Sequence, residues 1–511
     1  MEKLLKDRHL QALLVLCIIY ATYWTLYGNY QYTTYNDQFF DMGAFMSTFY
    51  QHLSCPNVAG LQYLVFSNHI APFLLLVLPF FALFPYPIVL FAIQAIFLAL
   101  AAMAIYFVCK DLLNSRNIGL VLAFAFLISP AVRGLTIYDF HEEAFIPLLY
   151  ILSFYFLWKA DRKHFIIAYS LMLGVFEPSV VVGLALLAGL LFYELLYDRG
   201  ISKDHAAYEK RMRLIAIGVA ITILFGLFYF GLDAYLLNAY QSAPYSSVPP
   251  IEKVIPFLSV QINSLVNSTT VQSIPGHSLY LAYYGPIGTA IEFLGFGITS
   301  LISPVLSMIL LSPWLGELFI MGNVSFAFPE SQYLGFFSGA SVVAAIMGLL
   351  IIKERRTFLS RWIRYGSRRF ELSYIFCTLL AAIIISALIL MGTNSVQSLL
   401  LDNAPAINYT QINSAIAAIP LNTSVMAQSD LSPHLYGHCS LELAPINRQW
   451  ISTYTPTVFW FKPQYIILDK KLSGYYLMVD NGAGFGVYNY AKGNYTEVYN
   501  KSGVYILKEI N

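Results

Sequence analysis

Long apolar segments recur along most of the chain and constrain its fold more than any other feature. Hydrophobic residues fill 58% of the 511 positions, far more than a soluble core of this length requires. The sequence therefore predicts a mostly α-helical, polytopic membrane protein with about eleven transmembrane helices. The spans are expected near residues 10–28, 87–109, 118–133, 144–158, 165–177, 179–197, 214–234, 286–303, 305–321, 334–352 and 372–391.

The apolar stretch PFLLLVLPFFALF, residues 72–84, is not counted as a span. It is too short to cross the hydrocarbon core, Pro79 interrupts it, and prolines flank it on both sides. We expect it to lie at the membrane interface, within a long first outer loop of residues 29–86.

Lys and Arg residues are distributed unevenly between the two predicted sides. With the N-terminus inside, the inner segments hold twenty of them, whereas the outer loops before residue 392 hold only Arg133 and Lys253. This asymmetry predicts a multi-pass protein of the cell membrane with a cytoplasmic N-terminus. Six N-x-S/T sequons fall on the predicted outer side and are candidate glycosylation sites: Asn267, Asn323, Asn408, Asn422, Asn494 and Asn500.

The pattern changes after residue 391. Short alternating segments such as NTSVMAQS, QYIILD, GFGVYNY and GVYILKE indicate strands, and NYTQINSAIAAI indicates a helix. We therefore expect two domains, a transmembrane domain of residues 1–391 and a small extracytoplasmic α/β domain of residues 392–511. Cys55 and Cys439 lie on the predicted outer side and are the one pair available for a disulfide there.

Acidic residues and histidines gather in the predicted outer loops, although charged residues make up only 11% of the chain. Ionisable side chains at membrane depth are costly and are functional candidates by default. We expect one outward-facing cavity to contain Asp41, His69, Asp139, His141, Glu143 and Glu177, three of them within YDFHEEAF (138–145).

Structural interpretations of the same residues stay open. Asp139 and Glu142 have the spacing of a capping box for the following span, and Asp37 suits a solvated turn. Glu177 precedes a proline and suits a helix stop, and His69 suits an interfacial side chain without a ligand. Carboxylate and imidazole ligands also suit a divalent metal such as Mg or Mn, but no spacing here matches a defined metal motif.

The loops resemble those of an uncharacterised family of prokaryotic predicted membrane proteins. The family's D-F-H-P-E-A is matched by Asp139 to Ala144, and its H-F-S-P by His69 to Pro72. Its D-x-G-x-x-D-Q is matched by Asp41 and Gly43, with Met and Ser replacing the second Asp and the Gln, and its K-E-D only by Glu177. The layout of the loops is also similar to that of the GT-C membrane glycosyltransferases, which use polyprenyl-phosphate sugars.

The GT-C resemblance implies transfer of a sugar from a polyprenyl-phosphate donor to an acceptor glycan, lipid or protein on the outer face. Asp41 would be the general base, by its match to the family motif, with His141 and Glu143 beside it in the catalytic site. Arg133, His69 and His141 would neutralise the phosphate, and Glu143 and Glu177 would hold sugar hydroxyls or position the histidines. Asp139 and Asp37 are further substrate-binding candidates.

Two other classes of protein remain as alternatives. A transporter or lipid flippase would favour ionisable groups near the bilayer midplane and an internal repeat, and neither is evident in the sequence. A non-catalytic surface protein would suit the incomplete motifs and the exposed tail. No nucleic-acid partner is expected, because the basic residues are concentrated in the inner segments.

Overall fold

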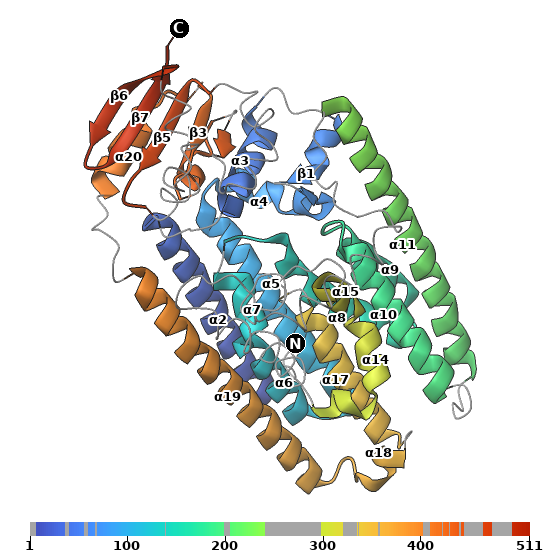
Figure 1. The fold of residues 1–511 in the computed structure, drawn as a ribbon. Helices are drawn as coiled ribbons and strands as arrows, with labels where there is room; N and C mark the ends of the chain where they lie inside the picture. Colours follow the sequence, from blue (N-terminus) through green and yellow to red (C-terminus); the bar gives the residue numbers. More distant parts are fainter. Residues whose placement is uncertain are drawn as a thin grey trace.

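The structure is a computed structural model in which helices predominate (Figure 1). It describes residues 7–35, 40–55, 60–66, 69–137, 139–198, 205–240, 298–319, 335, 337–355, 358–401, 409–421, 423–428, 430–438, 441–443, 463–472 and 493–510.

The longer helices form one bundle around a continuous apolar core (Figure 1). They are α2 (Arg8–Thr33), α5 (Pro87–Val108), α6 (Arg116–Ile128), α8 (Ile146–Trp158), α9 (Arg162–Leu173), α10 (Ser179–Tyr193), α11 (His205–Tyr240), α17 (Ser338–Lys353) and α19 (Arg368–Leu401). Apolar helices of this length bury their shared faces against one another and leave apolar side chains on the outside, as a bilayer requires.

Four helical segments of the described chain are long and apolar enough to cross a membrane. They are Arg8–Thr33, Pro87–Leu113, Ser179–Tyr197 and Ala206–Asp233, with a fifth if the bent pair Arg116–Ile128 and Pro130–Ile137 is one span. The first, second, sixth and seventh predicted spans thus coincide with such helices, while the total of eleven stays a prediction.

The span predicted at 118–133 corresponds to a bent pair of helices, which is a candidate span only if the pair crosses as one unit. The chain bends by 46° between α6 and α7 (Pro130–Ile137). Ser129 leaves the helical conformation, with ψ 136°, and the proline after it has no N–H to continue the helical hydrogen bonds.

Several other predicted spans correspond to shorter elements. Helices α8 and α9 have 13 and 12 residues, and the segment 305–321 contains α14 (Pro304–Leu310) and α15 (Ser312–Phe319). Of the segment 286–303, only η7 (Ile298–Ile302) and the residue after it are described. Residues 72–84 form η2 (Pro72–Leu76) and α4 (Leu78–Leu83), both too short to cross.

Helix α5 connects two chemically different ends of the bundle. Before it begins, the Pro85 carbonyl accepts a hydrogen bond from Tyr436 of the C-terminal region, 3.0 Å away. Beyond it, Asp111 pairs with Lys159 at 2.7 Å, and the Leu112 carbonyl accepts from Lys353 at 2.7 Å. We call these the sheet end and the basic end; α18 (Phe358–Trp362) lies at the basic end, opposite the β-sheet (Figure 1).

The C-terminal region contains a five-stranded mixed sheet in the order β4-β3-β5-β7-β6. Its strands are β3 (Val425–Ala427), β4 (Leu441–Leu443), β5 (Tyr465–Asp469), β6 (Tyr495–Lys501) and β7 (Val504–Glu509). Strand β3 pairs in parallel with β4 and β5, and β7 pairs antiparallel with β5 and β6. Helix α20 (Tyr409–Ala417) contributes Ile412 and Ala415 to a separate apolar core.

Three of the expected strand segments therefore contain β3, β5 and β7, and the expected helix contains α20. The fourth segment, GFGVYNY, lies outside the described residues. Cys55 is disulfide-bonded, whereas Cys439, the other cysteine on the predicted outer side, also lies outside them. Whether residues 392–511 act as a separate extracytoplasmic domain stays a prediction.

Candidate functional site

Segments far apart in the sequence bring a histidine and three glutamates together at the sheet end. We call His69, Glu142, Glu143 and Glu177 the carboxylate–imidazole cluster, since each of the three carboxylates acts electrostatically on the imidazole. His69 lies in β2 (His69–Ile70), which pairs with β1 (Val65–Phe66). Glu142 and Glu143 begin η4 (Glu142–Phe145), and Glu177 lies between α9 and α10.

His69 is held by two of these carboxylates. Its Nδ1 lies 3.1 Å from Glu177 Oε2 and its Nε2 lies 3.9 Å from Glu142 Oε1. Glu177 is held in turn by the Ile70 amide, which donates to its Oε1 at 2.6 Å. Burial lowers the pKa of His69, but the surrounding carboxylates outweigh that effect and raise it to about 9. The imidazolium form is therefore favoured at neutral pH.

Glu142 and Glu143 are buried more deeply than the histidine. The side chain of Glu142 is 1% exposed, against 20% for His69 and 21% for Glu177. Burial and the neighbouring Glu143 raise the pKa of Glu142, although His69 opposes them. Glu142 Oε1 and Glu143 Oε2 accept no hydrogen bond from the described residues. The cluster thus extends from a partly exposed ion pair to carboxylate oxygens that lack donors.

The capping-box interpretation of Asp139 and Glu142 is wrong. Neither η4 nor α8 has a side-chain cap. The Asp139 carboxylate instead accepts a hydrogen bond, at 3.2 Å, from the amide of Met42 in the first turn of α3 (Phe40–Ser54). A helix start leaves amides without partners, so an acidic acceptor from another loop fixes α3 in place.

Gln94 of α5 shapes the same loop and is not among the site residues predicted from the sequence. Its Oε1 accepts from the His141 amide at 2.7 Å, and its Nε2 donates to the Asp139 carbonyl at 3.3 Å. The His141 ring also turns back on this loop, with Nδ1 3.0 Å from the Asp139 carbonyl. The signal for Gln94 in the sequence is a single side-chain amide within an otherwise apolar span. Such a group needs polar partners and therefore indicates a buried polar contact.

The other predicted site residues are placed as follows. Asp41 lies in the first turn of α3, next to Met42, and only its backbone is described. Arg133 lies in α7 and is half-buried. Asp37 lies outside the described residues. The same is true of four sequons, those of Asn267, Asn323, Asn408 and Asn422, while Asn494 and Asn500 are exposed beside and within β6.

A metal site is not formed by the residues whose placement is known. Among them, no group of three or more His, Cys, Asp or Glu side chains is arranged to hold a metal ion. The imidazolium of His69 occupies the position between Glu142 and Glu177 that a cation would need. The expected Mg or Mn stays a prediction.

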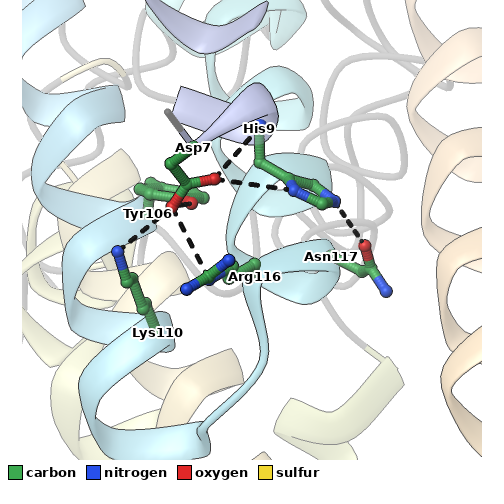
Figure 2. Close-up of polar contacts among 6 residues, drawn as sticks. All are labelled: Asp7, His9, Tyr106, Lys110, Arg116 and Asn117. Atoms are coloured by element: carbon green, nitrogen blue, oxygen red, sulfur yellow. Dashed lines mark hydrogen bonds and ion pairs between the residues drawn. The ribbon is translucent and has the colours of Figure 1, made fainter. Parts of the chain in front are cut away.

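A second buried polar group lies at the basic end and has the opposite character (Figure 2). In this Asp7 cluster, Asp7 Oδ2 accepts from Tyr106 at 3.0 Å and Lys110 at 3.2 Å, with Arg116 at 3.6 Å. Its Oδ1 accepts from the His9 amide and caps α2. Burial raises the pKa of Asp7, but these donors and charges together lower it to about 2. The arrangement joins α2, α5 and α6 as a structural contact.

A comparison with known protein families assigns the chain to one family. The model of a family described as predicted membrane protein (DUF2079) matches residues 19–506. No curated protein matches the chain. The match covers the bundle, the carboxylate–imidazole cluster and most of the C-terminal region.

Proposed function

The chain belongs to the DUF2079 family of predicted membrane proteins, and we propose that it is a membrane glycosyltransferase using a polyprenyl-phosphate sugar. One observation carries this proposal. Asp139, which lies three residues before Glu142 of the carboxylate–imidazole cluster, binds the start of the helix that carries Asp41. A cationic hydrogen-bond donor for the phosphate, carboxylates for the sugar hydroxyls and a candidate base are thus supplied by segments that Asp139 links.

The proposed reaction assigns a role to each group. The acceptor hydroxyl attacks the anomeric carbon, its proton passes to the Asp41 carboxylate, and the bond from that carbon to the phosphate oxygen breaks. Polyprenyl phosphate leaves as an anion, which His69 and Arg133 would stabilise. Glu143 and Glu177 would accept hydrogen bonds from the sugar, and the carboxylate oxygen of Glu143 without a donor supports this role.

We place the sheet end on the outer face of the membrane. This assignment is supported by the basic end, where Lys110, Lys159 and Lys353 gather around the end of α5. Cytoplasmic loops carry the excess of Lys and Arg in membrane proteins. The two exposed sequons near β6 agree with an extracytoplasmic C-terminal domain.

The test is a transfer assay on the purified full chain with a panel of polyprenyl-phosphate sugars, measuring release of polyprenyl phosphate. We expect Asp41→Asn to lower the rate by at least about a hundredfold. Asp111→Asn is the matched control, because Asp111 pairs with Lys159 at the basic end, and it should change the rate less than about twofold. Transfer unaffected by Asp41→Asn would overturn the assignment of the base, and no release from any donor would overturn the proposed activity.

Ion-coupled transport is a second candidate, favoured by the carboxylate oxygens of Glu142 and Glu143 that lack donors. Buried carboxylates that share a proton with an imidazolium suit a proton relay. Proteoliposomes loaded with a pH-sensitive dye would detect proton uptake, and its abolition by Glu142→Gln would favour transport over sugar transfer.

A further inference from the structure

The C-terminal region touches the bundle at the helix that carries Asp41. Gly43, two residues after Asp41, packs against η9 (Ser432–Leu435) of that region. A Cβ on Gly43 would lie 2.1 Å from Ser432 Oγ and 2.8 Å from Ser432 Cβ. Rotating the serine hydroxyl would relieve the first overlap but not the second. The two backbones are therefore closer than any residue with a side chain at position 43 permits.

The same short segment contacts two further elements of the bundle. The His434 ring stacks between Tyr32 and Tyr35 at the end of α2, with ring centroids 4.1 and 4.0 Å away. Tyr436 donates to the Pro85 carbonyl at 3.0 Å and meets the Tyr50 ring edge-on at 6.0 Å. Residues 432–436 are thus fixed against α2, α3 and the approach to α5.

The first turn of α3 is consequently held from two directions. Asp139 binds the Met42 amide on one side, and Ser432 fills the space beside Gly43 on the other. Figure 1 shows α3 between the sheet and the rest of the bundle. A shift of η9 would move α3 relative to Asp139 and hence relative to the carboxylate–imidazole cluster.

From this geometry we infer that the segment Ser432–Tyr436 is a positioning element of the site, acting through the contact between Ser432 and Gly43. The C-terminal region would then be required for the orientation of Asp41 as well as for any surface role. The part of this inference that concerns the reaction rate rests on the proposed function, whereas the part that concerns α3 does not.

The test is a pair of variants in the full chain, Gly43→Ala and the double variant Gly43→Ala/Ser432→Gly. Alanine has a higher helix propensity than glycine, so the first change harms α3 through the overlap of the new Cβ with η9, chiefly with Ser432. The second removes both overlapping Ser432 atoms and leaves the Pro433 backbone nitrogen 3.2 Å from the new Cβ, a contact that a shift of a few tenths of an ångström relieves. Gly231→Ala is the control, because no neighbouring heavy atom of the described residues lies within 4 Å of a Cβ placed there.

Two measurements separate this inference from the proposed function. Hydrogen exchange of the α3 amides should become at least about tenfold faster in Gly43→Ala and return to normal in the double variant. In Gly43→Ala the kcat for sugar transfer should fall about ten- to a hundredfold, while the KM for the donor changes less than about twofold. In the double variant the kcat should recover together with the normal exchange rate. If Gly43→Ala does not accumulate as folded protein, the yield of folded protein is measured instead. It should be higher for Gly43→Ala/Ser432→Gly than for Gly43→Ala.

Unchanged exchange in Gly43→Ala, or no rescue by Ser432→Gly, would overturn the inference. Faster hydrogen exchange of α3 in Gly43→Ala with an unchanged kcat would overturn the inference that this contact positions Asp41. A wild-type chain without transfer activity would count against the proposed function alone, because the exchange measurement would still decide whether η9 holds α3.

Discussion

The two buried polar clusters differ in how well their charges are compensated. In the Asp7 cluster one carboxylate receives hydrogen bonds from Tyr106 and Lys110, and Arg116 lies close by. In the carboxylate–imidazole cluster three carboxylates surround one imidazole, and two of their oxygens have no donor among the described residues. The first has a surplus of donors, and the second has a surplus of acceptors.

This difference assigns the two clusters different tasks. Buried polar groups are normally satisfied, and a fully satisfied network stabilises the packing of the elements that it joins. Carboxylates kept without donors carry a cost in stability, which proteins accept mainly where a ligand or a proton completes the arrangement. We therefore expect substitutions at the basic end to affect stability and substitutions at the sheet end to affect function.

The largest expected effect is on function at the sheet end. His69→Gln removes the imidazolium that we assign to the departing phosphate, and we expect a loss of about a hundredfold in kcat/KM. His164→Gln is the control, because His164 also pairs with a carboxylate, Asp161 at 2.7 Å, but is 56% exposed and far from the sheet end. A loss of similar size in both variants would contradict the division of tasks.

The next effect is on stability at the basic end. Asp7→Ala removes the cap of α2 and leaves Lys110 and Tyr106 without their acceptor. We expect it to lower the free energy of unfolding by about 2 to 3 kcal/mol, measured by thermal unfolding of the purified chain, with kcat per folded molecule unchanged.

Asp161→Ala is the matched control for this measurement, since Asp161 caps α9 through the His164 amide at an exposed position. It should lower the free energy of unfolding clearly less than Asp7→Ala does, because only an exposed cap is lost. Equal losses in the two variants would show that Asp7 acts as a cap alone.

The sequence predicted the features that depend on local residue patterns and on which side of the membrane a loop lies. Apolar runs predicted long helices at α2, α5, α10 and α11, and the loop motifs predicted the family, which the family match confirms. Placing the loops by side also suggested that His69 and Glu177 lie near YDFHEEAF, and the structure brings them together.

Other features depend on contacts between distant segments and have no local signal. The sequence spacing of Asp139 favoured a cap on its own helix, whereas its carboxylate binds α3, 97 positions earlier. The contact between Gly43 and Ser432 joins two segments that the change in sequence pattern after residue 391 separates. The bend at Pro130 did have a local signal, which the continuous apolar pattern outweighed.

A smaller effect is expected at alkaline pH. The folded state raises the pKa of both His69 and Glu142, so it binds protons more tightly than the unfolded chain does. The stability that His69 contributes is fully present below pH 6.5, its unfolded pKa, and is lost as the pH rises through about 9. The thermal midpoint of the wild type should therefore fall by about 2 °C over this range relative to His69→Gln/Glu142→Gln. Parallel pH profiles of the two proteins would contradict a raised pKa in the cluster.

The smallest effect is expected in acid, and it comes from the Asp7 cluster. The folded-state pKa of Asp7 lies at about 2, below its ordinary value of 3.8, so the ionised carboxylate stabilises the fold above pH 4 and this contribution is lost as the pH falls toward 2. Asp7→Asn keeps a capping side chain but cannot ionise. Asp161 also has a lowered pKa in both proteins, so only the difference between the two acid profiles reports on Asp7. We expect wild type and Asp7→Asn to converge in thermal midpoint between pH 4 and pH 2, and a constant gap would contradict the ionic role of Asp7.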